Sequence, residues 1–176
     1  MKMYVLLTFL SLMSAFSLNA FPSHKETYES IDAFANDFVK KHQLELLNKS
    51  GCGEGKNSLW GISVVSYELM TLEEGRKLAS NLSFGLLYRM YHDPVFATYK
   101  KELGMKCHSP ELIDSNISFR IAFWGKHCMN RPMPPYVAQI RLEKGNLYFH
   151  YADPTTKRLL EPIVESLESL NLPDYR

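Results

Sequence analysis

The sequence has few cysteines and no marked excess of charge of either sign. Three of the 176 residues are cysteine, and 20 Lys and Arg stand against 19 Asp and Glu. Such a balance gives no overall field to draw the chain toward nucleic acid or anionic lipid, and the sequence has no basic run with interleaved aromatic residues. We therefore expect no nucleic-acid partner.

Long apolar runs are also lacking, with one exception near the first residue. Tyr4 to Leu18 is apolar apart from Thr and Ser, follows the basic residue Lys2, and ends close to the small residue Ala20. This pattern is typical of a secretory signal peptide, and it is shorter than the roughly 20 apolar residues of a membrane-spanning helix. We expect cleavage near Ala20 and export to the periplasm or the medium. An uncleaved anchor is the alternative.

The remaining residues, 21–176, suit a single domain. They are enough to bury an apolar core and too few for two ordinary domains. They contain no second apolar stretch that is long enough to span a bilayer. We therefore expect one domain with no stable membrane span after cleavage.

Four stretches carry the signals of helix starts. Ser23–Glu26 and Thr71–Glu74 have capping-box spacing and precede apolar residues at helical intervals. Asp93-Pro94 and Asp153-Pro154 each place a cap residue before a proline suited to the first helical position. The helices expected from these signals cover about residues 24–43, 71–90, 94–103 and 154–170. Pro162 is expected to kink the last helix or to mark its true start.

Four other stretches predict strands, because they are rich in alternating or β-branched apolar residues. These strands are 60–69, 117–124, 137–142 and 147–151. The last two form a hairpin around Lys144-Gly145-Asn146, which we expect to join the strand before it. The order α-β-α-α-β-β-β-α predicts an α+β fold, with a four-stranded, largely antiparallel sheet and helices packed on at least one face. Two helices separate the first two strands, a connection long enough to make them parallel neighbours.

Several segments of the predicted domain carry a resemblance. A strand leads into Leu72–Leu78, which reads Leu-Glu-Glu-Gly-Arg-Lys-Leu. Tyr99 lies at a helix end, Ile117–Phe123 is an alternating strand, and Gly145–Tyr148 closes the hairpin. Over roughly residues 44–170 the chain resembles a group of uncharacterised exported proteins of intracellular bacteria. Ala97-Thr98 replaces an Arg-Pro of that group. The resemblance implies export and this order of elements, and it implies no activity.

The glycine-rich stretch Ser50–Ser58 does not fit a phosphate-binding loop. Ser50 and Asn57 stand where that loop needs a glycine and a metal-binding hydroxyl. The stretch also runs from a helix into a strand, which is the reverse of the required order. We interpret it as a flexible turn by which the chain leaves the first helix and enters the sheet.

The three cysteines favour a disulfide over catalysis or a metal site. An exported chain with an odd number of cysteines can form one bridge and keep one thiol. If strands 60–69 and 117–124 are parallel neighbours, Cys52 and Cys107 both enter from the same end of the sheet, while Cys128 emerges at the other. We therefore expect a Cys52–Cys107 bridge and a free Cys128.

Two cysteine–histidine pairs raise the question of zinc. Adjacent ligands such as Cys107-His108 and His127-Cys128 point apart, and the strand between them separates the pairs by roughly 25 Å. We expect neither a metal site nor another cofactor.

The sequence favours a non-catalytic exported domain that binds another protein or a small ligand. The binding surface is expected to be the Pro-rich connector Arg131–Pro135 or the sheet face, and the candidate ligand-face residues are Trp60, Trp124, Tyr148 and Tyr151. A hydrolase or thiol enzyme using Cys52 or Cys128 with a histidine is one alternative. A secreted enzyme inhibitor is another. No catalytic residue is assigned.

Overall fold

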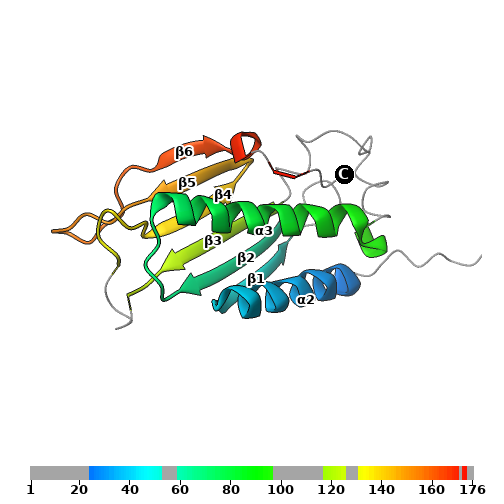
Figure 1. Ribbon diagram of the computed structural model, residues 1–176. Helices are drawn as coiled ribbons and strands as arrows, with labels where there is room; N and C mark the ends of the chain where they lie inside the picture. Colours follow the sequence, from blue (N-terminus) through cyan, green and yellow to red (C-terminus); the bar gives the residue numbers. More distant parts are fainter. Residues whose placement is uncertain (1–23, 53–58, 97–116, 126–130, 171, 174–176) are drawn as a thin grey trace, which may run out of the picture.

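The computed structural model describes residues 24–52, 59–96, 117–125, 131–170 and 172–173. Two helices, α2 (His24–His42) and α3 (Leu72–His92), lie on one face of a six-stranded sheet (Figure 1). The α+β class is confirmed. In the part of the chain that is described, neither helix is long and apolar enough to cross a membrane.

The six strands follow one another in the sheet in the order of the sequence. They are β1 (Glu45–Cys52), β2 (Leu59–Ser66), β3 (Ile117–Phe123), β4 (Gln139–Glu143), β5 (Asn146–His150) and β6 (Ile163–Ser166). β2 and β3 are parallel, and all other neighbours are antiparallel. The predicted parallel pair, and the hairpin joined to the strand before it, are therefore both confirmed.

The start of α3 follows the predicted capping box. The hydroxyl of Thr71 accepts a hydrogen bond from the Glu74 backbone N–H at 3.4 Å, and the Thr71 backbone N–H donates to the Glu74 carboxylate at 2.8 Å. These bonds satisfy two backbone N–H groups that otherwise stay unpaired at the start of a helix. The backbone N–H of Thr71, and then its hydroxyl, which also donates to the Glu74 carboxylate at 2.8 Å, hold the pKa of that carboxyl below its usual value. The sequence thus fixes where α3 begins.

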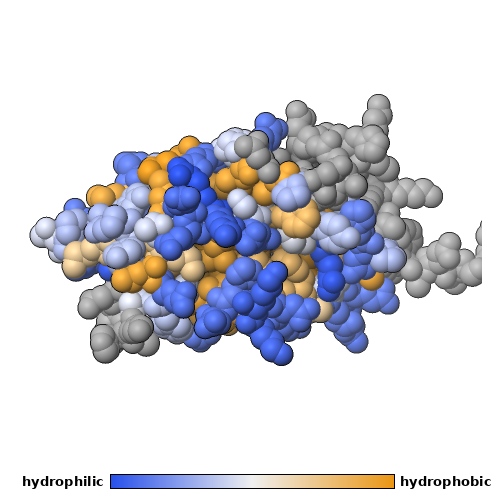
Figure 2. Space-filling view, viewed as in Figure 1, coloured by the Kyte–Doolittle hydropathy of each residue, from blue (hydrophilic) through white to orange (hydrophobic). Residues whose placement is uncertain are grey.

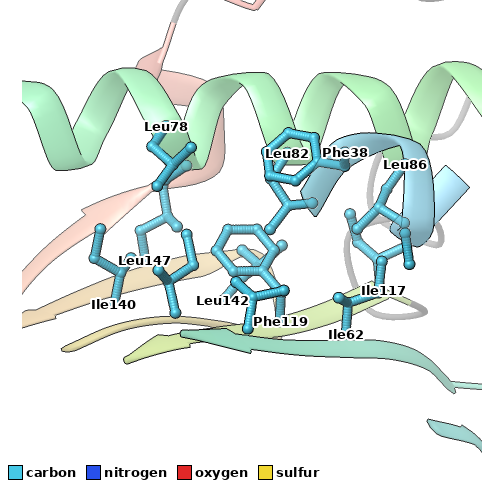
Figure 3. Close-up of a cluster of buried hydrophobic side chains, with 14 of the residues drawn as sticks. Phe38, Ile62, Leu78, Leu82, Leu86, Ile117, Phe119, Ile140, Leu142 and Leu147 are labelled. Carbon is cyan, nitrogen blue, oxygen red and sulfur yellow. The ribbon is translucent and has the colours of Figure 1, made fainter. Parts of the chain in front are cut away.

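The apolar core lies between this helix layer and the sheet. Figure 3 shows Leu78, Leu82 and Leu86 of α3 above the sheet residues Ile62 and Phe119, with further side chains from β3, β4 and β5. The α3 leucines recur every four residues and so share one helix face. Alternate residues of β2, β3, β4 and β5 meet this face, because successive side chains of a strand point to opposite sides.

The last strand is held in place from the helix layer. Arg76 of α3 donates from Nε to both carboxylate oxygens of Glu165 in β6 at 2.9 Å, and its Nη2 also contacts that carboxylate. Hydrogen bonding to Glu165 raises the pKa of Arg76. The same guanidinium lies 5.8 Å from the ring centroid of Phe149 in β5.

The predicted four-stranded sheet is wrong in its number of strands, because the sheet has a further strand at each edge, β1 and β6. β1 begins two residues after Gln43, where the chain leaves α2 with a φ of 53°. The first part of the glycine-rich stretch therefore belongs to a strand, in which Gly51 pairs with Trp60. Residues 53–58 lie outside the described part.

The predicted last helix is also wrong. The carboxylate of Asp153 accepts hydrogen bonds from the N–H groups of Thr155 and Thr156, which closes a turn and starts no helix. Pro162 cannot donate a helical hydrogen bond. After it the chain pairs with the free edge of β5 as β6 and ends in a 3-10 helix, η4 (Leu167–Leu170).

The helix expected at 94–103 is described only at its start. Pro94–Phe96 forms a 3-10 helix, η3, and the remaining residues of that prediction lie outside the described part. Phe96 is buried there, with its ring perpendicular to the ring of Trp60 at a centroid distance of 6.0 Å. The start of this segment therefore closes one end of the core.

Candidate functional site

The face of the sheet that points away from α2 and α3 carries a row of mostly polar side chains. One residue of each strand contributes to the row, and each is in register with the next. The row runs Asn48, Ser63, Arg120, Arg141, Tyr148 and Val164. We call this side of the sheet the open face.

Two arginines lie directly opposite each other in the middle of the open face. Arg120 of β3 pairs with Arg141 of β4 across an antiparallel ladder. Like charges in this position repel and destabilise the sheet. Neither arginine forms an ion pair with another residue of the described part. The pair therefore concentrates positive charge at the centre of the sheet.

Each guanidinium is held by a different neighbour. Arg120 donates from Nε to the Oε1 atom of Gln139 at 3.1 Å, and Gln139 is itself buried. The guanidinium of Arg141 lies over the ring of Tyr148, 5.5 Å from the ring centroid. Its Nε atom is buried and makes no hydrogen bond. These contacts restrict both side chains before any ligand arrives.

A hollow of about 250 Å³ lies beside the arginine pair, over β2, β3 and β4. Small residues make room for it, because Gly61 has no side chain and Ser63 and Ser118 have short ones. Arg120, Arg141 and Glu143 also line it. We call it the arginine hollow. Guanidinium and hydroxyl groups are all hydrogen-bond donors. Most of the polar lining of the hollow therefore suits a ligand group that accepts hydrogen bonds.

One end of the open face is closed. The row beside the arginines consists of Val65, Ala122, Gln139 and His150, all of them buried. The His150 Nδ1 atom lies 3.2 Å from the carbonyl oxygen of Leu160, in the segment after β5. Binding at this end would require that segment to move. The arginine hollow lies on the accessible part of the face.

The four aromatic residues predicted to form a ligand face do not lie together. Trp60 is 1% exposed and lies in the core on the helix side, so its assignment to an exposed face is corrected. Tyr151 packs against the same core. Trp124 is half-buried just after β3, where its backbone N–H donates to the carbonyl oxygen of Ser66. Tyr148 lies on the open face, under Arg141.

The cysteine predictions fall largely outside the described part. Cys107 and Cys128 lie outside it, as do His108 and His127, and for Cys52 only the backbone is described. That backbone ends β1 opposite Leu59, at the end of the sheet where β2 and β3 both begin. The described residues contain no group of three or more His, Cys, Asp or Glu placed to hold a metal ion. The disulfide stays a prediction.

A second hollow, of about 470 Å³, lies in the helix layer. Phe34 of α2 and Phe84 and Tyr88 of α3 give it an aromatic wall. Its charged groups already have partners, since Asp93 lies 3.8 Å from Arg89 and accepts a hydrogen bond from Ser30. On this side of the molecule, hydrophilic residues divide the apolar surface into separate patches (Figure 2). The arginine hollow is the stronger candidate, because neither of its arginines forms an ion pair with a described residue.

Neither arginine was identified from the sequence as a site residue. The available signal was the presence of a charged residue at a polar position of two predicted strands, Arg120 in 117–124 and Arg141 in 137–142. That signal is weak, because exposed strand positions are commonly charged. Only the register between β3 and β4 brings the two side chains together.

Comparison with known proteins adds no assignment. No protein-family model matches the chain, and no curated protein or solved structure matches it either.

Proposed function

We propose that this protein is an exported, non-catalytic domain that binds another molecule through the open face of its sheet. The helix-covered face is filled by the core and has no room for a partner. The open face instead presents a polar row with a hollow at its centre. This division suits a binding domain, in which one face folds the chain and the other is available for recognition.

The arginine pair is the observation that carries the proposal. A pair of like charges in direct register lowers the stability of a sheet, and neither arginine forms an ion pair with a described residue. A bound partner with negative charge would relieve this repulsion. The pair therefore favours binding over a purely structural role.

The proposal is tested by capture of partners from the native exported fraction. The purified protein serves as bait beside two variants, each lacking two positive charges: Arg120→Gln/Arg141→Gln on the open face and Lys77→Gln/Arg158→Gln elsewhere. Lys77 and Arg158 are both exposed. We expect a partner retained by the wild type and by the second variant and lost by the first. Equal retention by all three proteins would contradict binding through the open face.

Export is part of the proposal and rests on the apolar run before Ala20. Mass spectrometry of the mature protein is expected to show a first residue close to Phe21. A chain that keeps Met1 in the cytoplasm would contradict it.

The Cys52–Cys107 bridge likewise remains proposed. It is supported by the parallel pairing of β2 with β3, which brings the starts of both strands together. Non-reducing peptide mapping is expected to recover these two cysteines in one linked peptide, and a Cys107–Cys128 peptide would overturn the assignment.

A further inference from the structure

We propose that the arginine hollow binds an anionic oxygen group, the carboxylate or phosphate of a ligand or partner. This inference rests on the proposed binding function of the open face and names the chemistry that the face recognises. It follows from four features of the hollow: the charge of its two arginines, the way each is held, the hydroxyl groups beside them and its small size.

The two guanidiniums supply complementary donors. A guanidinium forms paired, charge-assisted hydrogen bonds with the oxygens of a carboxylate or phosphate. Arg120 uses its Nε to bind Gln139, which leaves its two terminal nitrogens for a ligand. The Nε atom of Arg141 is buried without a hydrogen bond, and its guanidinium carbon lies 5.5 Å from the Tyr148 ring centroid, so its two terminal nitrogens are the donors left for a ligand. An oxyanion between them would accept from both.

The lining of the hollow matches an oxyanion better than a cation or an apolar group. Ser63 and Ser118 lie on neighbouring strands and can donate from their hydroxyls, and Gly61 leaves the backbone open between them. A cation would meet two fixed positive charges. An apolar ligand would bury the guanidiniums without hydrogen bonds, at a cost that such a small contact area does not offset.

The size of the hollow limits what enters it. At about 250 Å³ it is smaller than the roughly 300–1,000 Å³ of pockets that enclose drug-sized ligands. It therefore accommodates one acidic group of a ligand, while the rest of that ligand lies along the open face. Tyr148 stands next in the row, with the Arg141 guanidinium over its ring.

A change at Glu143 is expected to have the opposite effect on anion binding to a change at the arginines. Its carboxylate lines the same hollow and forms no ion pair with either arginine. It therefore repels an incoming anion without blocking the arginines. Removing its charge is expected to tighten the binding of an oxyanion, whereas removing the arginine charges weakens it.

The test is a titration of the purified protein with inorganic phosphate and, separately, with acetate. The NMR signals of the arginine Nε–H groups monitor each titration. Sodium chloride at equal ionic strength serves as the control. We expect saturable shifts at Arg120 and Arg141 with at least one of the two anions, and the two arms show whether phosphate or carboxylate is preferred. The apparent affinity is expected to fall at least tenfold in Arg120→Gln and in Arg141→Gln, to rise in Glu143→Gln, and to stay unchanged in Lys77→Gln/Arg158→Gln.

Three results would overturn the inference: no saturable shift with either anion, equal shifts with chloride, or full binding by the two arginine variants. The arginine variants remain informative because both side chains lie outside the core, so a folded-state spectrum is expected for each.

Failure of anion binding is distinct from failure of the proposed function. If the capture experiment still depends on the open face while neither anion binds, the face recognises a partner by another chemistry; if both fail, the open face is not a binding surface.

Discussion

Two neighbouring residues of β3 lie in opposite surroundings. Phe119 is 3% exposed and packs under α3, whereas the next residue, Arg120, is exposed and lies opposite a second arginine. One face of the sheet thus buries apolar side chains, and the other keeps two like charges that form no ion pair with a described residue. The stability of the fold is concentrated on one face, which leaves the other free to carry features that do not stabilise the chain.

The largest expected effect is on the helix-covered face. Phe119→Ala removes a ring from the middle of the core and leaves a cavity, so the free energy of unfolding should fall by about 3–5 kcal/mol. Urea denaturation followed by circular dichroism measures this loss. Ser118→Ala, on the open side of the same strand, is the control and should change stability by less than about 0.5 kcal/mol. Similar losses for both variants would contradict the concentration of stability on the helix-covered face.

A smaller effect is expected at the edge of the sheet. Glu165→Gln removes the charged partner of Arg76 and is expected to cost about 1 kcal/mol, because the pair is bidentate but partly exposed. The amides of β6 should exchange faster with solvent, which hydrogen-exchange mass spectrometry detects. Glu161→Gln, at an exposed position outside the strand, should leave the exchange of β6 unchanged. Unaltered exchange in Glu165→Gln would show that backbone pairing alone holds the strand.

A pH effect is expected in the helix layer. Burial, and then the nearby charge of Lys41, lower the pKa of His42 from its usual value of 6.5. The unfolded chain therefore binds more protons at this group than the folded one, and stability should rise with pH through the window just below 6.5. Urea midpoints between pH 5 and 7.5 measure the slope, which should be shallower in His42→Gln. An equal slope in that variant would assign the dependence to other groups.

The parts of the fold that the sequence predicts are those with strong local signals. The capping box at Thr71 and the leucine spacing after it define α3, and the turn at Lys144-Gly145 defines the β4–β5 hairpin. β1 and β6 lack such signals. β6 even has helical spacing of its apolar residues, and it forms a strand because Pro162 breaks the helix and the edge of β5 is free to pair.

The site was harder to predict than the fold. The assembly of the arginine hollow needs the register of β2, β3 and β4 together, and register is a long-range property that no local pattern of Arg120 or Arg141 encodes. Aromatic content was the misleading signal. It pointed to Trp60, which is large and apolar enough to be drawn into the core.

The free energy of unfolding of Arg120→Ala/Arg141→Ala, measured in urea without ligand, tests most directly whether the open face serves binding. Removing the pair relieves repulsion between like charges and gives up only the stacking on Tyr148 and one hydrogen bond to Gln139. If the arginines serve binding, the variant should be as stable as the wild type, within about 0.5 kcal/mol, or more stable. A loss of more than about 1.5 kcal/mol would show that the pair stabilises the sheet, and would contradict the division of the two faces into one that folds the chain and one that binds.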